Sequence, residues 1–433
     1  MPKRLHVSAP DFQQAFVALL GEKRESSVGV DDTVREIIAG VRARGDVALI
    51  DYSKRFDAVD LTQAGLRVAE TEIDAAVKAC SAQTLDALSF AHDRIIGHHR
   101  RQLPKDDLYT DAAGVELGSR WTAVESVGLY VPGGLASYPS SVLMNAAPAV
   151  VAGVPRIVMV VPTPRGEINP LVLAAARLAG VHEIYRVGGA QAVAALAYGT
   201  RSIAPVVKIV GPGNAYVAAA KRQVFGKVGI DSVAGPSEVL IIADADNDPD
   251  WIAADLLAQA EHDTAAQSIL MTDSAPFASA VEAAVARQLK TLPRAAIASA
   301  SWNEFGAIIV LNTFDEAPAL ADQIAAEHLQ ICTPNPHALA DKIRNAGAIF
   351  LGAHTPEAIG DYVSGSNHVL PTARSARFSS GLGTLDFMKR TSTLKLDATA
   401  LAALGPAAMT LARAEGLEAH RTSVELRMKK GTA

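Results

Sequence analysis

The chain has 433 residues, of which 49% are hydrophobic and 20% are charged, and its 32 glycines and 22 prolines are too few for a collagen-like or low-complexity protein. The 40 Lys and Arg against 46 Asp and Glu give a net charge of −6 with no basic block, which argues against nucleic acid as a partner. The length predicts two or three domains with a substantial core and excludes a small binding module.

The two cysteines, Cys80 and Cys332, are too few for a disulfide framework or a four-thiolate zinc site, which is typical of a protein of the reducing cytosol. The first residues lack the apolar core of a signal peptide, because Asp11 and two glutamines interrupt it. The longest apolar stretch, 142–155, is broken by Pro148 and is too short to span a membrane. We therefore expect a soluble cytoplasmic protein with no membrane partner.

The first 120 residues or so are expected to be mainly helical. Apolar residues recur at helical spacing from Asp31 onward, and Thr33 and Glu36 can form a capping box. Further helices are expected over 46–56 and 72–101. The three histidines of the last stretch, at positions 92, 98 and 99, have no partner carboxylate at metal-ligand spacing and are expected in solvent-exposed or capping roles.

The middle of the chain alternates β-branched runs with Ala-rich helices, the pattern of strand–helix–strand units in a parallel sheet. The expected strands cover 156–161, 183–187 and 206–210, and the expected helices cover 170–179, 190–198 and 215–225. A second α/β unit follows, with strands over 239–243, 268–272, 308–311 and 348–351 and helices over 251–262 and 317–329. Past Gly381 the sequence turns helical again and is expected to form an appended segment.

Glycine turns follow three of these apolar runs, at 128–134, 188–191 and 211–214. Such turns suit phosphate groups, because a helix N-terminus presents free backbone amides and a partial positive charge. None fits the G-x-G-x-x-G fingerprint or a P-loop, so each is equally well a structural turn. Tyr130, in the first of them, could stack on a flat ring.

Several polar pairs could carry chemistry. Gln259 and His262 are three apart on a predicted helix and can point at one metal ion, although glutamine is an uncommon ligand and a hydrogen-bonded histidine is the alternative. Glu327 and His328, at the predicted end of the helix 317–329, pair a carboxylate with a base that titrates near neutrality, or simply form a charged last turn.

Two further pairs lie in less regular sequence. Asp361 and His368 share a loop rich in glycine, serine and asparagine, where polar groups can converge on a ligand. Glu415 and His420 flank a glycine turn in the tail, and are otherwise surface residues of an amphipathic segment. From spacing alone, the function stays open between a metal-dependent enzyme and a ligand-binding protein.

Taken together, nine stretches in order over about 300 residues resemble histidinol dehydrogenases. They are VGLYVPGG (127–134), GGAQA (188–192), KIVGPGN (208–214), AGPSE (234–238), QAEH (259–262), AEHL (326–329), NHVLPT (367–372), RFSS (377–380) and EGLEAH (415–420). The resemblance implies a zinc-dependent enzyme that oxidises L-histidinol to L-histidine through an aldehyde with two NAD⁺ in succession, at the end of histidine biosynthesis.

The resemblance also implies an α/β fold and a domain plan. That fold has two Rossmann-like parallel-sheet domains without the usual G-x-G-x-x-G fingerprint, plus small helical segments at the two ends. We expect a helical segment over 1–26, a discontinuous first domain over 27–129 with 239–381, a second domain inserted over 130–238, and a tail over 382–433 that completes the site of the other subunit of a homodimer.

By the same resemblance the candidate residues acquire roles. One Zn²⁺ per subunit would be bound by Gln259, His262 and Asp361, with His420 arriving from the other subunit. His328 would be the general base and Glu327 would activate water. Ser237, His368 and Glu415 would contact the substrate together with His328 and the four metal ligands, and Tyr130, Gln191 and Asn214 would contact NAD⁺.

Two other functions compete with this one. A related zinc dehydrogenase could act on another small polar alcohol, such as a sulfonated propanediol, but Glu415 would repel a sulfonate and suits a cationic amine. A non-catalytic zinc or nucleotide-binding protein has no need of both Glu327 and His328 beside its ligand. Nitrogen and oxygen ligands accept several divalent ions, so zinc itself rests on the resemblance.

Overall fold

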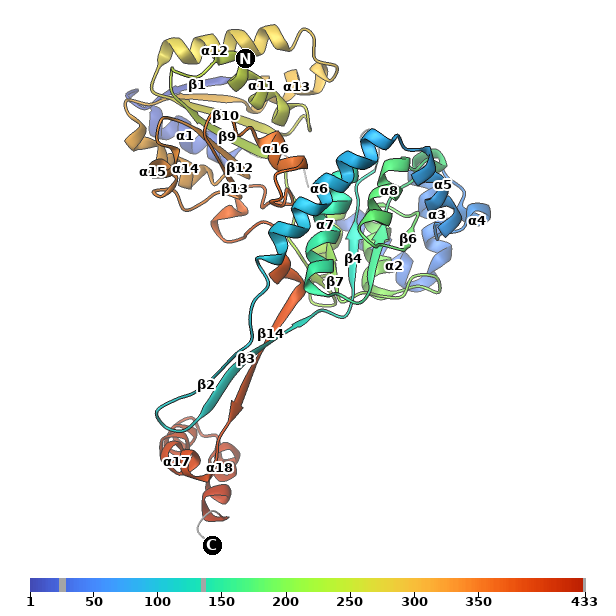
Figure 1. Cartoon of the computed structure of the whole chain (residues 1–433), viewed down its shortest axis with the longest axis vertical. Coiled ribbons are helices and arrows are strands. Elements are labelled where there is room, and N and C mark those ends of the chain that lie inside the picture. The colour runs from blue at the N-terminus through green and yellow to red at the C-terminus, as the bar shows by residue number, and fades with distance from the viewer. Residues whose placement is uncertain (23–28, 134–137, 431–433) are drawn as a thin grey trace.

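The computed structural model describes residues 1–22, 29–133 and 138–430. Two α/β bodies lie side by side, and a narrow stalk carries the C-terminal helices away from both of them (Figure 1). Each body is built on a parallel sheet, which confirms the predicted fold class. The predicted domain boundary at residues 26–27 and the last glycine of the first turn, Gly134, lie outside the described residues.

The first body is a six-stranded sheet of order β1-β11-β10-β9-β12-β13, with every neighbouring pair parallel. Its strands are β1 (Lys3–His6), β9 (Glu238–Ala243), β10 (Gln267–Thr272), β11 (Ala307–Val310), β12 (His328–Cys332) and β13 (Ala348–Leu351). Strands buried on both faces read as continuous apolar runs, and in β9 Leu240 and Ile242 face one core while Val239 and Ile241 face the other.

Helices cover both faces of this sheet. One face holds α1 (Phe12–Gly21), α14 (Ala317–Ile324) and α15 (Pro336–Ala340), and the other holds α11 (Pro249–Ala260), α12 (Ala275–Gln288) and α13 (Ala295–Phe305). A short helix, α16 (Glu357–Tyr362), follows β13. Because β1 pairs with β11, the first residues form an edge of this sheet rather than a separate helical segment.

The second body is a five-stranded parallel sheet of order β6-β5-β4-β7-β8. Its strands are β4 (Val127–Tyr130), β5 (Ile157–Val160), β6 (Glu183–Tyr185), β7 (Lys208–Val210) and β8 (Gly229–Ile230). One face is covered by α5 (Glu70–Ala79), α6 (Ala82–Arg100), α7 (Pro139–Ala152) and α8 (Pro170–Leu178), and the other by α2 (Val30–Arg44), α3 (Asp46–Phe56), α9 (Gly189–Tyr198) and α10 (Ala215–Val224).

The helices between residues 30 and 100 were expected to belong with 239–381, and this grouping is wrong. Their buried residues, such as Ile37 and Ile95, share cores with β4, β5 and α9 of the five-stranded body. The expected helix over 72–101 is two helices that separate at Cys80 and Ser81. His99 is fully buried with Nδ1 2.8 Å from the Ile95 carbonyl oxygen, so the expected exposure of this histidine is also wrong.

The stalk is an antiparallel ribbon of order β14-β3-β2, built from β2 (Asp107–Thr110), β3 (Glu116–Ala123) and β14 (Met388–Lys395). The helical structure predicted for these regions is wrong. β2 and β14 are largely exposed and lack the alternation of apolar and polar residues that marks a half-buried strand. At the far end of the stalk lie α17 (Ala398–Ala414) and α18 (Glu418–Lys430). Among the described helices none is long and apolar enough to cross a membrane.

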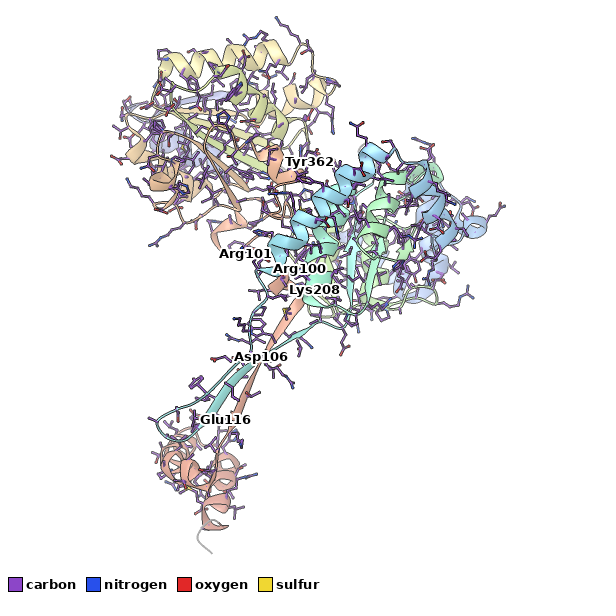
Figure 2. All side chains as sticks on the ribbon, viewed as in Figure 1. Arg100, Arg101, Asp106, Glu116, Lys208 and Tyr362 are labelled. Carbon is purple, nitrogen blue, oxygen red and sulfur yellow. The ribbon has the colours of Figure 1, made fainter. Side chains whose placement is uncertain are left out.

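Figure 2 shows how the three parts meet. Tyr362, the last residue of α16, lies beside α6, and Arg94 on α6 donates a hydrogen bond of 2.9 Å to the Ser364 carbonyl just beyond it. Arg100 ends α6 where the chain leaves for the stalk, and Glu116 lies along the stalk toward the C-terminal helices. The segment after α16 is therefore held against the five-stranded body.

Candidate active site

A cluster of buried polar residues lies at the amino ends of β9 and β12, which are neighbours in the six-stranded sheet. The register pairs His328 with Val239, which brings Glu327 next to Ser237 and Glu238. The Glu238 amide is 3.3 Å from Glu327 Oε2 and donates to it. Two motifs that are 90 residues apart in the sequence thus meet at one edge of the sheet.

His328 begins a strand rather than ending a helix. The predicted helix 317–329 stops at Ile324, where Ala325 adopts a left-handed conformation with φ +48° that reverses the chain into β12. The side chain of His328 is buried, and burial, with a smaller contribution from the neighbouring His262 and His368, lowers its pKa to about 3. The imidazole is therefore neutral at physiological pH.

The surroundings of His328 select one tautomer of that neutral ring. Nδ1 lies 3.1 Å from Gln259 Oε1 and 3.3 Å from the Glu238 carbonyl oxygen, and Glu357 Oε2 is 3.7 Å away. A carbonyl oxygen only accepts, so Nδ1 carries the proton and Nε2 carries the lone pair. Within the described residues Nε2 has no hydrogen-bond partner, and its nearest carboxylate is that of Asp361, at 3.9 Å.

Glu327 is the acid of the cluster. Burial is the main cause that raises its pKa to about 8. The hydrogen bonds from Ser237 and the Glu238 amide lower the pKa, and the negative charges of Glu238 and Asp361 raise it. Near neutral pH the carboxyl is therefore mostly protonated next to a neutral His328. Two groups whose environments push their pKa values in opposite directions mark the acid and the base of a catalytic site.

The three candidate metal ligands of one chain surround His328. Gln259 lies in the last turn of α11, buried, and its Oε1 keeps a second lone pair besides the one that faces His328. The predicted helix 251–262 ends at Ala260, but the His262 amide still donates to the Gln259 carbonyl oxygen at 3.1 Å, so the turn keeps the two residues together. Asp361 comes from α16.

An amide oxygen, an imidazole and a carboxylate form a donor set that suits zinc. His262 is accessible to solvent, although the surrounding protein lowers its pKa, so it can bind a metal as a neutral ring. Gln259 Nε2 is buried without a hydrogen bond in the described part of the chain, which leaves the amide without a fixed partner on that side. Across the same residues no three His, Cys, Asp or Glu side chains gather to hold a metal.

His368 closes the other side of the cluster. Its Nδ1 donates to the Asp361 carbonyl oxygen at 2.9 Å, and its Nε2 lies 3.2 Å from Ser141 Oγ on α7. Burial, together with the charge of His262, lowers the pKa of His368 to about 4. The loop predicted to gather polar groups thus does so, and it joins the six-stranded body to the five-stranded one.

Glu415 and His420 are not brought to this cluster by their own chain. Glu415 ends α17 and His420 lies on α18, both exposed at the far end of the stalk (Figure 1). Seven of the nine predicted catalytic, substrate and metal residues therefore converge within one chain, and the two from the tail do not.

The three candidate cofactor residues lie at the carboxyl edge of the five-stranded sheet. Tyr130 ends β4, and its hydroxyl accepts a hydrogen bond of 3.0 Å from the Gly189 amide at the start of α9, the helix that also holds Gln191. Asn214 caps α10, its Oδ1 accepting from the amides of residues 216 and 217 at 3.1 and 3.2 Å. Tyr130 is buried, burial raises its pKa to about 12, and its hydroxyl holds the glycine turn in place.

The strand order makes this edge a natural binding site. β5 and β6 lie on one side of β4 and β7 and β8 lie on the other, so the connections diverge between β4 and β7, and ligands of open α/β sheets bind at such points. Beside it, a cavity of about 430 Å³ is lined by Pro132 and Gly133 after β4 and by Pro162, Pro164 and Arg165 after β5. The backbone amides at the start of α10 face this edge.

Glu357 is the functional candidate that motif reasoning missed. It begins α16 with its side chain 2% exposed, and burial, with the charges of Asp361, Asp255 and Glu327, raises its pKa well above the ordinary value. A signal was present, because Glu357 is four residues before Asp361 and the two share one face of a helix. Ser141, beside His368, carried no comparable signal.

Comparison with known proteins agrees with the family resemblance of the sequence motifs and extends it over nearly the whole chain. The family described as histidinol dehydrogenase matches residues 21–428. The chain is 68% identical over 428 residues to the histidinol dehydrogenase of Brucella suis biovar 1, covering 99% of this chain and 100% of that one, and 69% identical to that of Bradyrhizobium diazoefficiens, covering 99% of each. The crystal structure of histidinol dehydrogenase from Elizabethkingia anophelis matches with a TM-score of 0.95 at 35% identity, covering 100% of this chain and 99% of that one. The chain belongs to the histidinol dehydrogenase family.

Proposed function

We propose that the protein oxidises L-histidinol to L-histidine by way of L-histidinaldehyde, with two molecules of NAD⁺ as successive hydride acceptors. The family uses Zn²⁺ and NAD⁺ and acts in histidine biosynthesis. The observation that carries the proposal is the buried His328, neutral and with a free Nε2, beside the protonated Glu327 and within reach of three zinc-type ligands. A binding protein has no use for an acid and a base placed in this way.

Gln259, His262 and Asp361 would hold one zinc ion per subunit, with His420 of a second copy as the fourth ligand. Zinc bound there would hold the amino and imidazole nitrogens of histidinol and so fix the carbinol carbon in place. Ser237, His368 and Glu415 are proposed to contact the substrate, and the carboxylate of Glu415 suits its positive charge.

In the first oxidation, His328 Nε2 accepts the proton of the substrate hydroxyl while the hydride of the carbinol carbon passes to NAD⁺. This yields the aldehyde and NADH and leaves the proton on His328. An imidazolium is costly in this buried place, and its charge is offset by Asp361 near Nε2 and by Glu357 near Nδ1. The raised pKa of Glu357 falls when a positive charge forms beside it, so this carboxyl can ionise as His328 takes the proton. The base thus works only with these neighbours in position.

In the second oxidation, the ionised form of Glu327 takes a proton from water as the water adds to the aldehyde carbon. The protonated His328 gives its proton to the aldehyde oxygen in the same step, so the products are the gem-diol and a neutral imidazole. His328 then accepts a proton from the gem-diol while its hydride passes to a second NAD⁺, and the product is the carboxylic acid. Both steps use one substrate position, so the aldehyde need not leave the protein between them.

The cofactor is proposed to bind at the carboxyl edge between β4 and β7. The start of α10, capped by Asn214, suits the pyrophosphate, because helix N-termini bind anions. Tyr130 and Gln191 shape the adjacent glycine turn. The cavity after β4 and β5 has room for another part of the dinucleotide.

A homodimer with shared sites is proposed for the tail. The stalk carries Glu415 and His420 away from their own chain's cluster, and the helices at its end expose Leu404, Leu411 and Leu426 to solvent. Such apolar side chains favour burial against another surface. We also propose a cytoplasmic location, since both cysteines fall in the described part of the chain and are free thiols.

The test is a count of NADH. Zinc-loaded protein is given excess NAD⁺ and a limiting amount of L-histidinol, and the absorbance of NADH is followed to its end point. Two NADH per histidinol, abolished by a chelator and recovered with Zn²⁺, support the proposal. No NADH from histidinol with zinc bound would overturn it, and a sulfonated propanediol, assayed in parallel, would then identify the related alcohol dehydrogenase.

A further inference from the structure

We propose that the buried ion pair of Lys221 and Asp231 positions the glycine turn at Gly211 for NAD⁺, and so sets the affinity for the cofactor without affecting zinc or the substrate. The inference rests on the proposed binding of NAD⁺ between β4 and β7. Neither charged residue belongs to a motif that the function uses.

The two side chains are held deep inside the five-stranded body. Lys221 lies on α10 and Asp231 follows β8, and their side chains are 2% and 5% exposed. Besides contacting each other, both bind the same residue. Lys221 Nζ donates to the Gly211 carbonyl oxygen at 3.0 Å, and Asp231 Oδ2 accepts from the Gly211 amide at 2.7 Å.

Gly211 needs such support because it belongs to no regular element. β7 ends at Val210 and α10 begins at Ala215, so the Gly211 amide and carbonyl are left without partners from a sheet or a helix. Its φ is +113°, and a Cβ atom on it would lie 2.1 Å from the Tyr130 carbonyl oxygen. The turn therefore touches the end of β4, and only glycine fits there.

The location connects this support to the cofactor. On one side Gly211 contacts Tyr130, whose hydroxyl fixes the Gly189 amide; on the other side it leads into Asn214 and the first amides of α10. A shift of Gly211 would move α10 relative to β4, the two walls of the proposed cofactor site. The catalytic cluster lies on the other sheet, so it is not expected to respond.

A purely structural role makes a different prediction. Buried ion pairs are expensive, and apolar residues of similar size can replace them with no loss of stability. If stability were the only role, an apolar double variant that folds normally would also bind NAD⁺ normally. If the pair positions Gly211, the same variant binds NAD⁺ poorly, because the amide and carbonyl of Gly211 have lost their partners.

The experiment uses full-length, zinc-loaded protein. Lys221→Met, Asp231→Asn and the double variant Lys221→Met with Asp231→Leu are compared with the parent by thermal unfolding, zinc content, NADH binding followed by fluorescence, and steady-state kinetics. We expect the dissociation constant of NADH and the KM for NAD⁺ to rise about tenfold or more in the folded variants, with the KM for histidinol and the zinc content changed by less than about twofold.

Glu183→Gln is the matched control. Glu183 accepts two hydrogen bonds from Arg156, at 2.8 and 2.9 Å, at the amino edge of the same sheet, so this variant breaks an ion pair on the side away from the cofactor. We expect no change in NADH affinity. Lys221→Arg is the variant to use if Lys221→Met or Asp231→Asn folds poorly. It retains the positive charge, so its NADH affinity should lie between that of the double variant and that of the parent.

The outcomes separate this inference from the proposed function. Unchanged NADH affinity in a folded double variant, or an equal loss for NADH and histidinol, overturns the role of the pair and leaves the function in place. If the parent binds NADH but does not oxidise histidinol, the proposed function is wrong, while the binding data still decide the role of Lys221 and Asp231.

Discussion

The two sheets present opposite edges to their proposed ligands. In the five-stranded body the candidate residues lie at the carboxyl ends of strands, where glycine turns expose backbone amides and side chains such as Tyr130 hold those turns in place. In the six-stranded body they lie at the amino ends of β9 and β12, and the candidates are buried titratable side chains. Backbone amides suit the binding of an anionic cofactor, whereas shifted pKa values suit proton transfer.

Removing the base is the most direct test of whether proton transfer and cofactor binding are assigned to different sheets. His328→Asn preserves a polar side chain of similar reach but cannot accept the substrate proton, so we expect kcat to fall by about 10²- to 10⁴-fold. Zinc content and NADH affinity should stay near those of the parent, because the cofactor edge belongs to the other sheet. If His328→Asn kept more than about a tenth of the parent kcat, His328 would not be the base.

A second large effect tests whether the tail completes the amino-edge site of another chain. His420→Ala should lose zinc and activity together, since it removes one of the four proposed ligands. Mixing this variant with His328→Asn protein should restore part of the activity, because one hybrid site would then contain both residues. Verified subunit exchange without recovery would count against shared sites. The oligomeric state is followed in parallel by light scattering.

Glu327→Gln should separate the two oxidations. Without a carboxylate to activate water, the second step slows by about 10²- to 10⁴-fold while the first persists. A limiting amount of histidinol should then yield one NADH rapidly and the second slowly or not at all, and the aldehyde can be trapped with semicarbazide. Two NADH formed at equal rates would show that another group activates the water.

The same residue predicts a pH dependence of stability in metal-free protein. The pKa of Glu327 rises from 4.5 to about 8 on folding, so its contribution to the free energy of unfolding is full below pH 4.5 and is lost as the pH rises through about 8. His328, with its pKa lowered from 6.5 to about 3, contributes fully above pH 6.5 and loses that contribution as the pH falls. Glu327→Gln should flatten the alkaline side of a melting-temperature profile, and His328→Asn the acidic side.

A smaller effect is expected from Glu357→Gln. The variant retains the shape of the side chain but cannot carry the charge that offsets a protonated His328, so kcat should fall by about tenfold and its pH profile should shift. At neutral pH the melting temperature should rise by a few degrees. Because the pKa of Glu357 is raised, the parent has to take up a proton on this carboxyl when it folds, and the glutamine variant does not. Equal kcat values in the two proteins at all pH values would limit Glu357 to a packing role.

The smallest effect is expected at Cys332. Its thiol is buried at the end of β12, and burial raises its pKa to about 11, so no thiolate is present near neutral pH. Cys332→Ala should retain kcat within about twofold, measured as NADH formation. Loss of both oxidations in a folded variant would instead favour a covalent route through the thiol.

The parallel strands could be predicted from the sequence because runs such as 239–243 are apolar on both faces and end at turn residues. The stalk could not, since β14 is exposed on both sides and offers no periodicity. The grouping of the helices between residues 30 and 100 with the five-stranded sheet depends on contacts between distant segments, which periodicity does not report.

The catalytic pair shows the same limit. The types of residue at 327 and 328 indicate acid–base chemistry, but the reversal at Ala325 and the neighbour Glu357 are visible only in three dimensions. Gln259 and His262 were placed correctly side by side because a single turn determines their separation.

The pairing of β1 with β11 has a consequence for how the chain is made. Residues 3–6 are synthesised about 300 residues before their partner strand, 307–310, so β1 waits that long for its pairing with β11. All strands of the five-stranded sheet lie between these two segments and can pair before either is in place. On the ribosome, the five-stranded sheet that is proposed to bind the dinucleotide can therefore form while the sheet that carries the acid and the base is still open.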